Sequence, residues 1–125
     1  YYKDGKWHET HGNGQTSEYE AFELARNYDE EPAYRSISMG LPQIMGFNYS
    51  FAGYSSAKDM FDSFCIDEYT QVAAFGRFIA AYDNGSLLSA CQQRDFFEMA
   101  KIYNGNGEAY KPKLEKNTAD YANAL

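Results

Sequence analysis

Apolar residues recur at three- and four-residue intervals along most of the chain, and this spacing is typical of helices that bury one face. The clearest stretch begins after Asp67, a predicted N-cap, and ends at Asn84-Gly85. Its predicted buried face consists of Val72, Phe75, Gly76, Ile79 and Tyr82. The pattern therefore predicts a mainly α fold.

Other helix starts are marked by side chains that can accept a hydrogen bond from the first helical turn. Ser17 followed by Glu20 has the spacing of a capping box, and Ser56 marks another start. Pro32 is tolerated in the first turn of a short helix that follows Asp29. The expected helices cover residues 17–28, 29–36, 56–64, 67–85, 86–92 and 95–103, the last of these capped by Asp95, and a final helix begins at Glu108 or Pro112 and ends at Ala124.

Two segments do not follow the helical pattern. Residues 1–15 form an irregular start in which Asp4-Gly5 has the composition of a hairpin turn. Residues 36–53 are rich in small and apolar residues, and Pro42 prevents a continuous helix through them. The amide of Gln43 in this segment either bonds to the backbone in the core or faces a ligand.

Length and charge limit the classes of function. The chain has 125 residues, so we expect one mainly α domain over 1–125, with a helical body at 17–125 and at most a small hairpin near the N-terminus. A net charge of −7 without a cluster of Lys or Arg argues against nucleic acid as a partner. No apolar run approaches the ~20 residues of a membrane span, and Tyr1–Asp4 lacks the apolar stretch of a signal peptide, so we expect no membrane insertion.

Aromatic residues are abundant, with 12 Tyr, 9 Phe and one Trp. Tyr rings suit sugar rings and protein interfaces as well as cores, because the ring stacks while the hydroxyl forms hydrogen bonds. Cys65 and Cys91 lack the spacing of a zinc site, and two interpretations stay open, buried free thiols and one disulfide. His8 and His11 lie in the irregular start without a further ligand in a defined element, so we expect no metal site.

Two short segments carry the strongest functional signal. The first is Ser36-x-Ser38-x-Gly40-Leu41-Pro42-Gln43-Ile44-Met45, and the second is Ala100-x-x-Tyr103-Asn104-Gly105-x-Gly107. In this order they resemble two glycan-cleft motifs of the lysozyme-like superfamily, which includes goose-type lysozymes and lytic transglycosylases. From about Glu18 to Tyr121 the chain resembles, more closely, the N-acetylmuramidase domain of phage endolysins and bacterial wall hydrolases.

The resemblance implies a peptidoglycan hydrolase that acts at the bacterial cell wall and cleaves the glycan strand beside N-acetylmuramic acid. It implies no cofactor, and it favours hydrolysis over cyclisation to an anhydro sugar. Gln43 would bind sugar hydroxyl or acetamido groups, and Tyr103 would orient the acid or the substrate. The full set of substrate-binding candidates that the resemblance implies is Ser36, Ser38, Gly40, Gln43, Tyr103 and Asn104.

The catalytic acid is the main departure from the family pattern. In the family the catalytic glutamate lies in a Glu-Ser-Gly-Gly-like segment, followed by a Phe-Glu-x-His-x-Phe segment, and both would precede Tyr1. We therefore expect that an N-terminal segment supplies the acid, and that a wall-binding domain is a further candidate partner. Glycoside cleavage needs a protonated carboxylic acid and often a second carboxylate, for which the candidates within the chain are Glu9, Asp29 and Glu31.

Two alternative functions stay open. A non-catalytic peptidoglycan-binding module would keep the cleft without the acid. A helical interaction domain would instead use its Tyr-rich surface to bind a protein, although the pair of cleft motifs argues against it.

Overall fold

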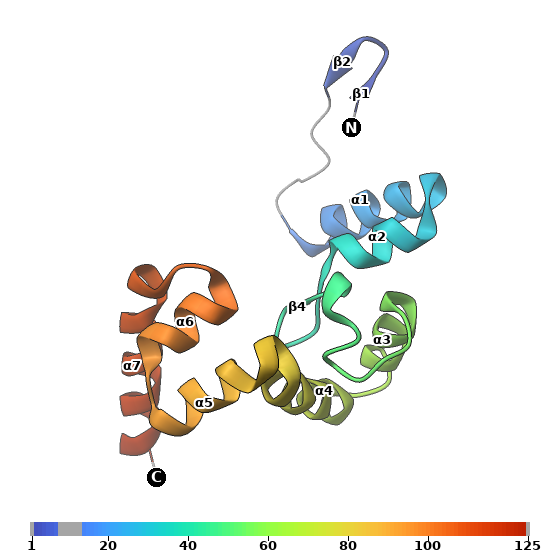
Figure 1. Cartoon of the computed structure of the whole chain (residues 1–125). Helices are drawn as coiled ribbons and strands as arrows, with labels where there is room; N and C mark the ends of the chain where they lie inside the picture. Colours follow the sequence, from blue (N-terminus) through green and yellow to red (C-terminus); the bar gives the residue numbers. More distant parts are fainter. Residues whose placement is uncertain (1, 8–13, 125) are drawn as a thin grey trace. The chain divides into compact units, whose positions relative to one another are not determined.

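The computed structural model describes residues 2–7 and 14–124 (Figure 1). The chain forms two compact units, Tyr1–Ala73 and Ala74–Leu125. Helices dominate both units, which confirms the predicted mainly α class. That the whole chain forms one domain stays a prediction.

A small hairpin opens the first unit, as its sequence predicts. Strands β1 (Tyr2–Lys3) and β2 (Lys6–Trp7) pair antiparallel, with Tyr2 opposite Trp7. The turn residues Asp4 and Gly5 have left-handed φ angles of 52° and 75°, which is the conformation that an Asp-Gly turn favours.

Helices α1 (Gln15–Tyr28) and α2 (Glu30–Ser36) follow, and α1 packs on α2. The predicted capping box at Ser17 is wrong. The helix begins two residues earlier, at Gln15, and the Ser17 hydroxyl donates a hydrogen bond to the Gly14 carbonyl at 2.8 Å. Ser17 therefore occupies the first turn, where its hydroxyl bonds back to the residue that precedes the helix.

A second hairpin, which the sequence pattern does not predict, lies in the segment after α2. Strands β3 (Ser38–Met39) and β4 (Ile44–Met45) pair antiparallel and lead into the 3-10 helix η1 (Gly46–Asn48). Gly46 packs against α2 so closely that a Cβ there would lie 1.9 Å from the Tyr34 carbonyl oxygen. Only glycine fits this contact, so the hairpin is tied directly to the end of α2.

Helices α3 (Ala57–Phe64) and α4 (Glu68–Ala81) begin where the sequence predicts. The Ser56 hydroxyl accepts from the Asp59 backbone N–H at 3.0 Å, and the Asp67 carboxylate accepts from Thr70 N–H at 2.7 Å. Both are the N-cap bonds that satisfy a donor of the first turn.

The core of the first unit is a cluster of three rings beneath these helices. Phe22, Tyr34 and Phe61 come from α1, α2 and α3, and their ring centroids lie 5.2 to 5.4 Å apart. Ala33 and Ala57 are buried beside Phe22 and Tyr34. Edge-to-face packing of this kind gives aromatic rings both area burial and fixed geometry. The core therefore fixes the mutual positions of α1, α2 and α3.

The second unit is built from the end of α4, the 3-10 helix η2 (Tyr82–Gly85), α5 (Ser86–Gln93), α6 (Phe96–Asn104) and α7 (Gly107–Asn123). Asp95 caps α6 as predicted, accepting from Glu98 N–H at 3.1 Å. The last helix begins at Gly107, before both predicted starts, because the Asn106 side chain caps it through Ala109 N–H at 3.0 Å.

The predicted buried face of α4 is only partly correct. Ala74 and Phe78 are the buried residues of this helix, whereas Val72 is 59% exposed. Two residues along a helix correspond to a rotation of about 200°, so Val72 lies on the face opposite Ala74. Phe75 and Tyr82 are partly buried.

Candidate functional site

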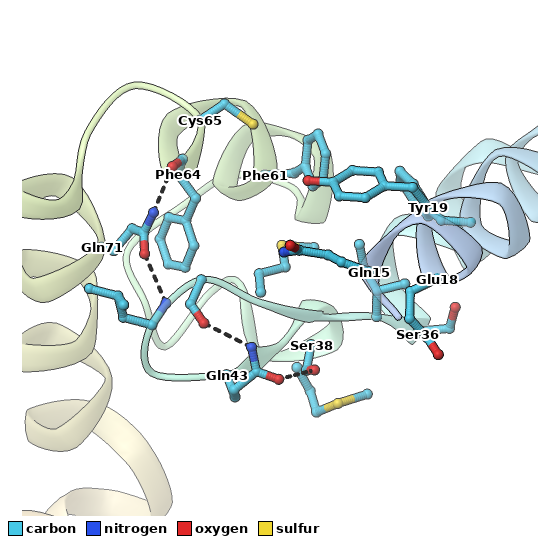
Figure 2. Close-up of a pocket in the computed structure, with 16 residues that line it drawn as sticks. Gln15, Glu18, Tyr19, Ser36, Ser38, Gln43, Phe61, Phe64, Cys65 and Gln71 are labelled. Atoms are coloured by element: carbon cyan, nitrogen blue, oxygen red, sulfur yellow. Dashed lines mark hydrogen bonds between the residues drawn. The ribbon is translucent and has the colours of Figure 1, made fainter. Parts of the chain in front are cut away.

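A pocket of about 960 Å³ lies in the first unit (Figure 2). One face of α1 forms part of its wall. The end of α2 and the β3–β4 hairpin that follows it form another part, and the C-terminal end of α3 and the start of α4 complete it. The lining residues are Gln15, Glu18, Tyr19, Phe22, Ser36, Ile37, Ser38, Met39, Gly40, Leu41, Gln43, Met45, Phe61, Phe64, Cys65 and Gln71. This volume is in the range of ligand-binding clefts, roughly 300 to 1,000 Å³.

Four of the predicted substrate-binding residues meet at this pocket. Ser36, Ser38, Gly40 and Gln43 all line it, because the hairpin folds the motif back on itself. The side chains of Ser38 and Gln43 are exposed. They therefore form an accessible polar edge to the pocket.

Gln43 is held in place by hydrogen bonds within the hairpin. Its Oε1 accepts from the Ser38 hydroxyl at 2.8 Å, and its Nε2 donates to the Gly40 carbonyl at 2.9 Å (Figure 2). A primary amide has two donor hydrogens and two acceptor lone pairs. After these two bonds, one amide hydrogen and one lone pair of Gln43 can still bind a ligand.

Two hydrogen bonds of the Gln71 side chain connect the turn of the hairpin to the rest of the first unit. Its Oε1 accepts from the Leu41 backbone N–H at 2.8 Å, and its Nε2 donates to the Phe64 carbonyl at 2.8 Å. A Cβ on Gly40 would lie 2.7 Å from Gln71 Oε1 and from a ring carbon of Phe64. The turn thus packs against α3 and α4 with no room for a side chain at Gly40.

Apolar surface completes the pocket. Tyr19 is 53% exposed and Leu41 is 67% exposed, although both are large apolar residues. Phe22 and Phe61 belong to the aromatic core and also line the pocket, so the wall rests on rigid packing. A site that mixes exposed apolar faces with fixed amides and hydroxyls is chemically suited to a saccharide.

Carboxylates are scarce at this pocket. Of the described residues that line it, Glu18 is the only one that carries a charge at neutral pH. Asp29 and Glu31, two of the predicted carboxylate candidates, are not among its lining residues. Glu31 lines a shallower depression of about 360 Å³ together with Pro32, Arg35, Ser36 and Phe47. Glu9 lies outside the described residues.

Sequence reasoning missed Glu18 as a site residue. A signal was present, since Gln15, Glu18, Tyr19 and Phe22 have the spacing of one helical face and combine polar with aromatic groups. The part of that face between Gln15 and Phe22, in the N-terminal half of α1, lines the pocket.

The remaining two predicted binding residues belong to the second unit. Tyr103 lies on α6, and its ring packs edge-on against Phe75 and Phe78 with centroid distances of 5.8 Å. Burial raises the pKa of the Tyr103 hydroxyl, which therefore stays protonated at neutral pH. Asn104 is exposed at the end of α6.

Both cysteines are free thiols in the structure. Cys65 lines the pocket and is exposed, so the expectation that both thiols are buried is wrong for this residue. The reason is that Cys65 occupies the C-cap of α3, where the apolar face of the helix ends. Cys91 is partly buried in α5, and this burial raises its pKa. Among residues 2–7 and 14–124, no group of three or more His, Cys, Asp or Glu side chains could hold a metal ion.

Comparison with known proteins decides the family. A family model described as N-acetylmuramidase matches residues 2–122. The chain belongs to the N-acetylmuramidase family. This confirms the resemblance seen in the sequence, and N-acetylmuramidase membership supports a peptidoglycan-hydrolase type of function at the cell wall. No curated protein and no solved structure gives a significant match.

The N-acetylmuramidase match covers both compact units, including the pocket of the first and Tyr103 of the second. In the part of the chain that the structure describes, no helix is long and apolar enough to cross a membrane.

Proposed function

We propose that this N-acetylmuramidase binds the glycan strand of peptidoglycan in the pocket formed by α1, the β3–β4 hairpin and α3, and hydrolyses it beside N-acetylmuramic acid. The observation that carries the proposal is the exposed amide of Gln43, held by Ser38 and Gly40 at the edge of a cleft-sized pocket. No cofactor takes part.

The chemistry of the pocket fits a neutral sugar polymer. An amide that is already oriented binds a hydroxyl or acetamido group with little further loss of freedom. Gln43 and Ser38 supply such groups, and Tyr19 offers an exposed ring to the apolar face of a sugar. Gly40 lets the turn pack directly against Phe64 and Gln71. Ser36, whose hydroxyl donates to the Ala33 carbonyl at 2.9 Å, forms the adjoining part of the wall.

Tyr103 and Asn104 are proposed as substrate-binding residues of the second unit. The Tyr103 hydroxyl, kept protonated by burial, can donate a hydrogen bond to a carboxylate or to a sugar oxygen. Asn104 is exposed and can present its amide to an acetamido group. The family resemblance, rather than the contacts of this unit, supports these two roles.

The position of the general acid has to be located by experiment. Hydrolysis requires a carboxylic acid kept protonated, usually by an apolar site. The resemblance assigns this acid to a segment preceding Tyr1, so the test compares the 125-residue chain with a version extended upstream by its native sequence.

The experiment is mass spectrometry of purified peptidoglycan after incubation with each version. New reducing N-acetylmuramic acid ends from the extended version support the proposal and assign the acid to the upstream segment. The same products from the 125-residue chain support the proposal and assign the acid to the chain itself. Glycan binding without products from either version would contradict hydrolysis and favour a binding module, and anhydro products would favour transglycosylation.

A further inference from the structure

Glu18 differs from the other carboxylates of the first unit in its place on the fold. It lies in the first turn of α1, on the helix face that also carries Gln15, Tyr19 and Phe22. Figure 2 shows Glu18 and Ser36 at the side of the pocket away from Gln71 and Phe64. Its charge therefore lies at the wall of a pocket whose other described lining residues are uncharged.

Other acidic residues nearby do not line this pocket. Glu23 lies on α1 and Glu31 on α2, and neither is among the lining residues. Glu20 is exposed on α1 and does not line the pocket. Glu18 is thus the described carboxylate best placed to meet a ligand in the pocket.

The exposure of Glu18 favours one chemical role over another. A general acid must hold its proton at neutral pH, which requires an apolar or anionic site. Glu18 is exposed at the wall of an open pocket, which is not the apolar enclosure that a general acid needs. A carboxylate in such a pocket can accept a proton from water, and the pocket has room for that water beside a sugar.

We infer that Glu18 is a catalytic residue that acts as the general base of glycan hydrolysis, and this inference rests on the proposed function. A water oxygen forms a bond to the anomeric carbon and transfers a proton to the Glu18 carboxylate. The bond between the anomeric carbon and the glycosidic oxygen breaks, and that oxygen takes a proton from the carboxylic acid of the enzyme. The negative charge of Glu18 also stabilises the positive charge that develops on the sugar.

The test uses the natural full-length polypeptide and two matched variants, Glu18→Gln and Glu20→Gln. Both remove one charge from the same helix, and both are near-isosteric, so circular dichroism and thermal unfolding should show equal folding. Steady-state kinetics on purified peptidoglycan and glycan binding are measured for all three proteins.

Glu18→Gln is expected to lower kcat by about 100-fold or more while glycan binding is retained, because general base catalysis typically contributes that much. Glu20→Gln should match the wild type in every measurement.

Two results would overturn the inference. In the first, Glu18→Gln is as active as Glu20→Gln. In the second, Glu18→Gln loses glycan binding while kcat is unchanged, which would make Glu18 a binding group only. A wild type that releases no products would instead contradict the proposed function, and the two failures are therefore distinguishable.

Discussion

Gln43 has a left-handed backbone, with φ of 55°, and its amide is bound to Ser38 and Gly40. Left-handed residues other than glycine are uncommon and cost free energy, so they persist where neighbouring contacts hold them. These two contacts use half of the hydrogen-bonding capacity of the amide. The strained turn therefore holds a fixed polar group at the edge of the pocket.

Gln43→Ala tests this role. The substitution removes one donor and one acceptor from the pocket, so we expect KM for peptidoglycan to rise roughly tenfold, since a hydrogen bond contributes about 0.5 to 1.5 kcal/mol. Gln92→Ala is the control, because Gln92 is an exposed glutamine of α5. Equal KM values for the two variants would show that Gln43 does not bind substrate.

Gly40→Ala tests the close packing of the turn. A Cβ there meets Gln71 and Phe64 at 2.7 Å and also sits on a backbone with φ of 67°. Gly105→Ala is a matched control, since its φ is 72° and its Cβ would have nothing within 4 Å. We expect Gly40→Ala to lower the free energy of unfolding by about 1 to 3 kcal/mol more than Gly105→Ala. Urea denaturation measures the free energy of unfolding of both variants. Equal losses in the two variants would contradict the close packing of the turn against Gln71 and Phe64.

At the scale of elements, side-chain caps made the helix boundaries predictable. Ser56, Asp67 and Asp95 each accept a backbone N–H at the start of a helix, as their sequence patterns indicate. The capping box predicted at Ser17 was wrong because a hydroxyl can also donate a hydrogen bond to a preceding carbonyl. The sequence does not distinguish the two bonds.

The β3–β4 hairpin could not be predicted by the same means. Its turn uses left-handed backbone at both Gly40 and Gln43, and glutamine is not a residue that signals such a turn. The motif resemblance nevertheless pointed to Ser36, Ser38, Gly40 and Gln43, all of which line the pocket. Glu18 was missed because its distance to the hairpin depends on how α1 packs on α2, which periodicity does not specify.

The Asp67 carboxyl, which caps α4, is expected to make the stability of the fold depend on pH. The Thr70 backbone N–H holds the pKa of the Asp67 carboxyl below its usual value in the folded protein. A group with a lowered folded-state pKa stabilises the fold above its unfolded-state pKa, and this stabilisation is lost as the pH falls through the folded-state value.

Asp67→Asn keeps a capping oxygen but removes the titration. We expect the stability advantage of the wild type over Asp67→Asn to be larger at pH 6 than at pH 2, because the ionised carboxylate also favours a helix N-terminus. Urea unfolding at the two pH values measures it. A difference that does not change with pH would contradict the role of the charge.

At the scale of the whole molecule, the charge of −7 bears on how the protein approaches the wall. Most ion pairs that the structure describes, such as Lys58 with Asp62 at 2.5 Å, lie between neighbouring turns of single helices and are solvent-exposed, and Arg26 with Glu30 at 3.9 Å joins α1 to α2. Exposed pairs contribute little to stability, so modest salt should leave the fold unchanged. Salt should instead act on long-range repulsion from anionic wall polymers.

We therefore predict that activity on walls carrying anionic polymers rises as salt is added from near zero to about 0.1 M, where the Debye length is about 10 Å. Peptidoglycan stripped of those polymers is the control substrate, on which this rise should be absent. Release of soluble glycan measures both. Activity that only falls over this range on the intact wall would contradict the prediction.

The central claim is that the pocket of the first unit holds the glycan. Its most direct test is an NMR titration of the 15N-labelled 125-residue chain with a soluble oligosaccharide of alternating N-acetylglucosamine and N-acetylmuramic acid. We predict that the largest shifts occur at the amides of residues 15–22, 36–43 and 71, which line the pocket. Saturable binding with shifts confined to residues outside the pocket would contradict the claim, as would no binding at all.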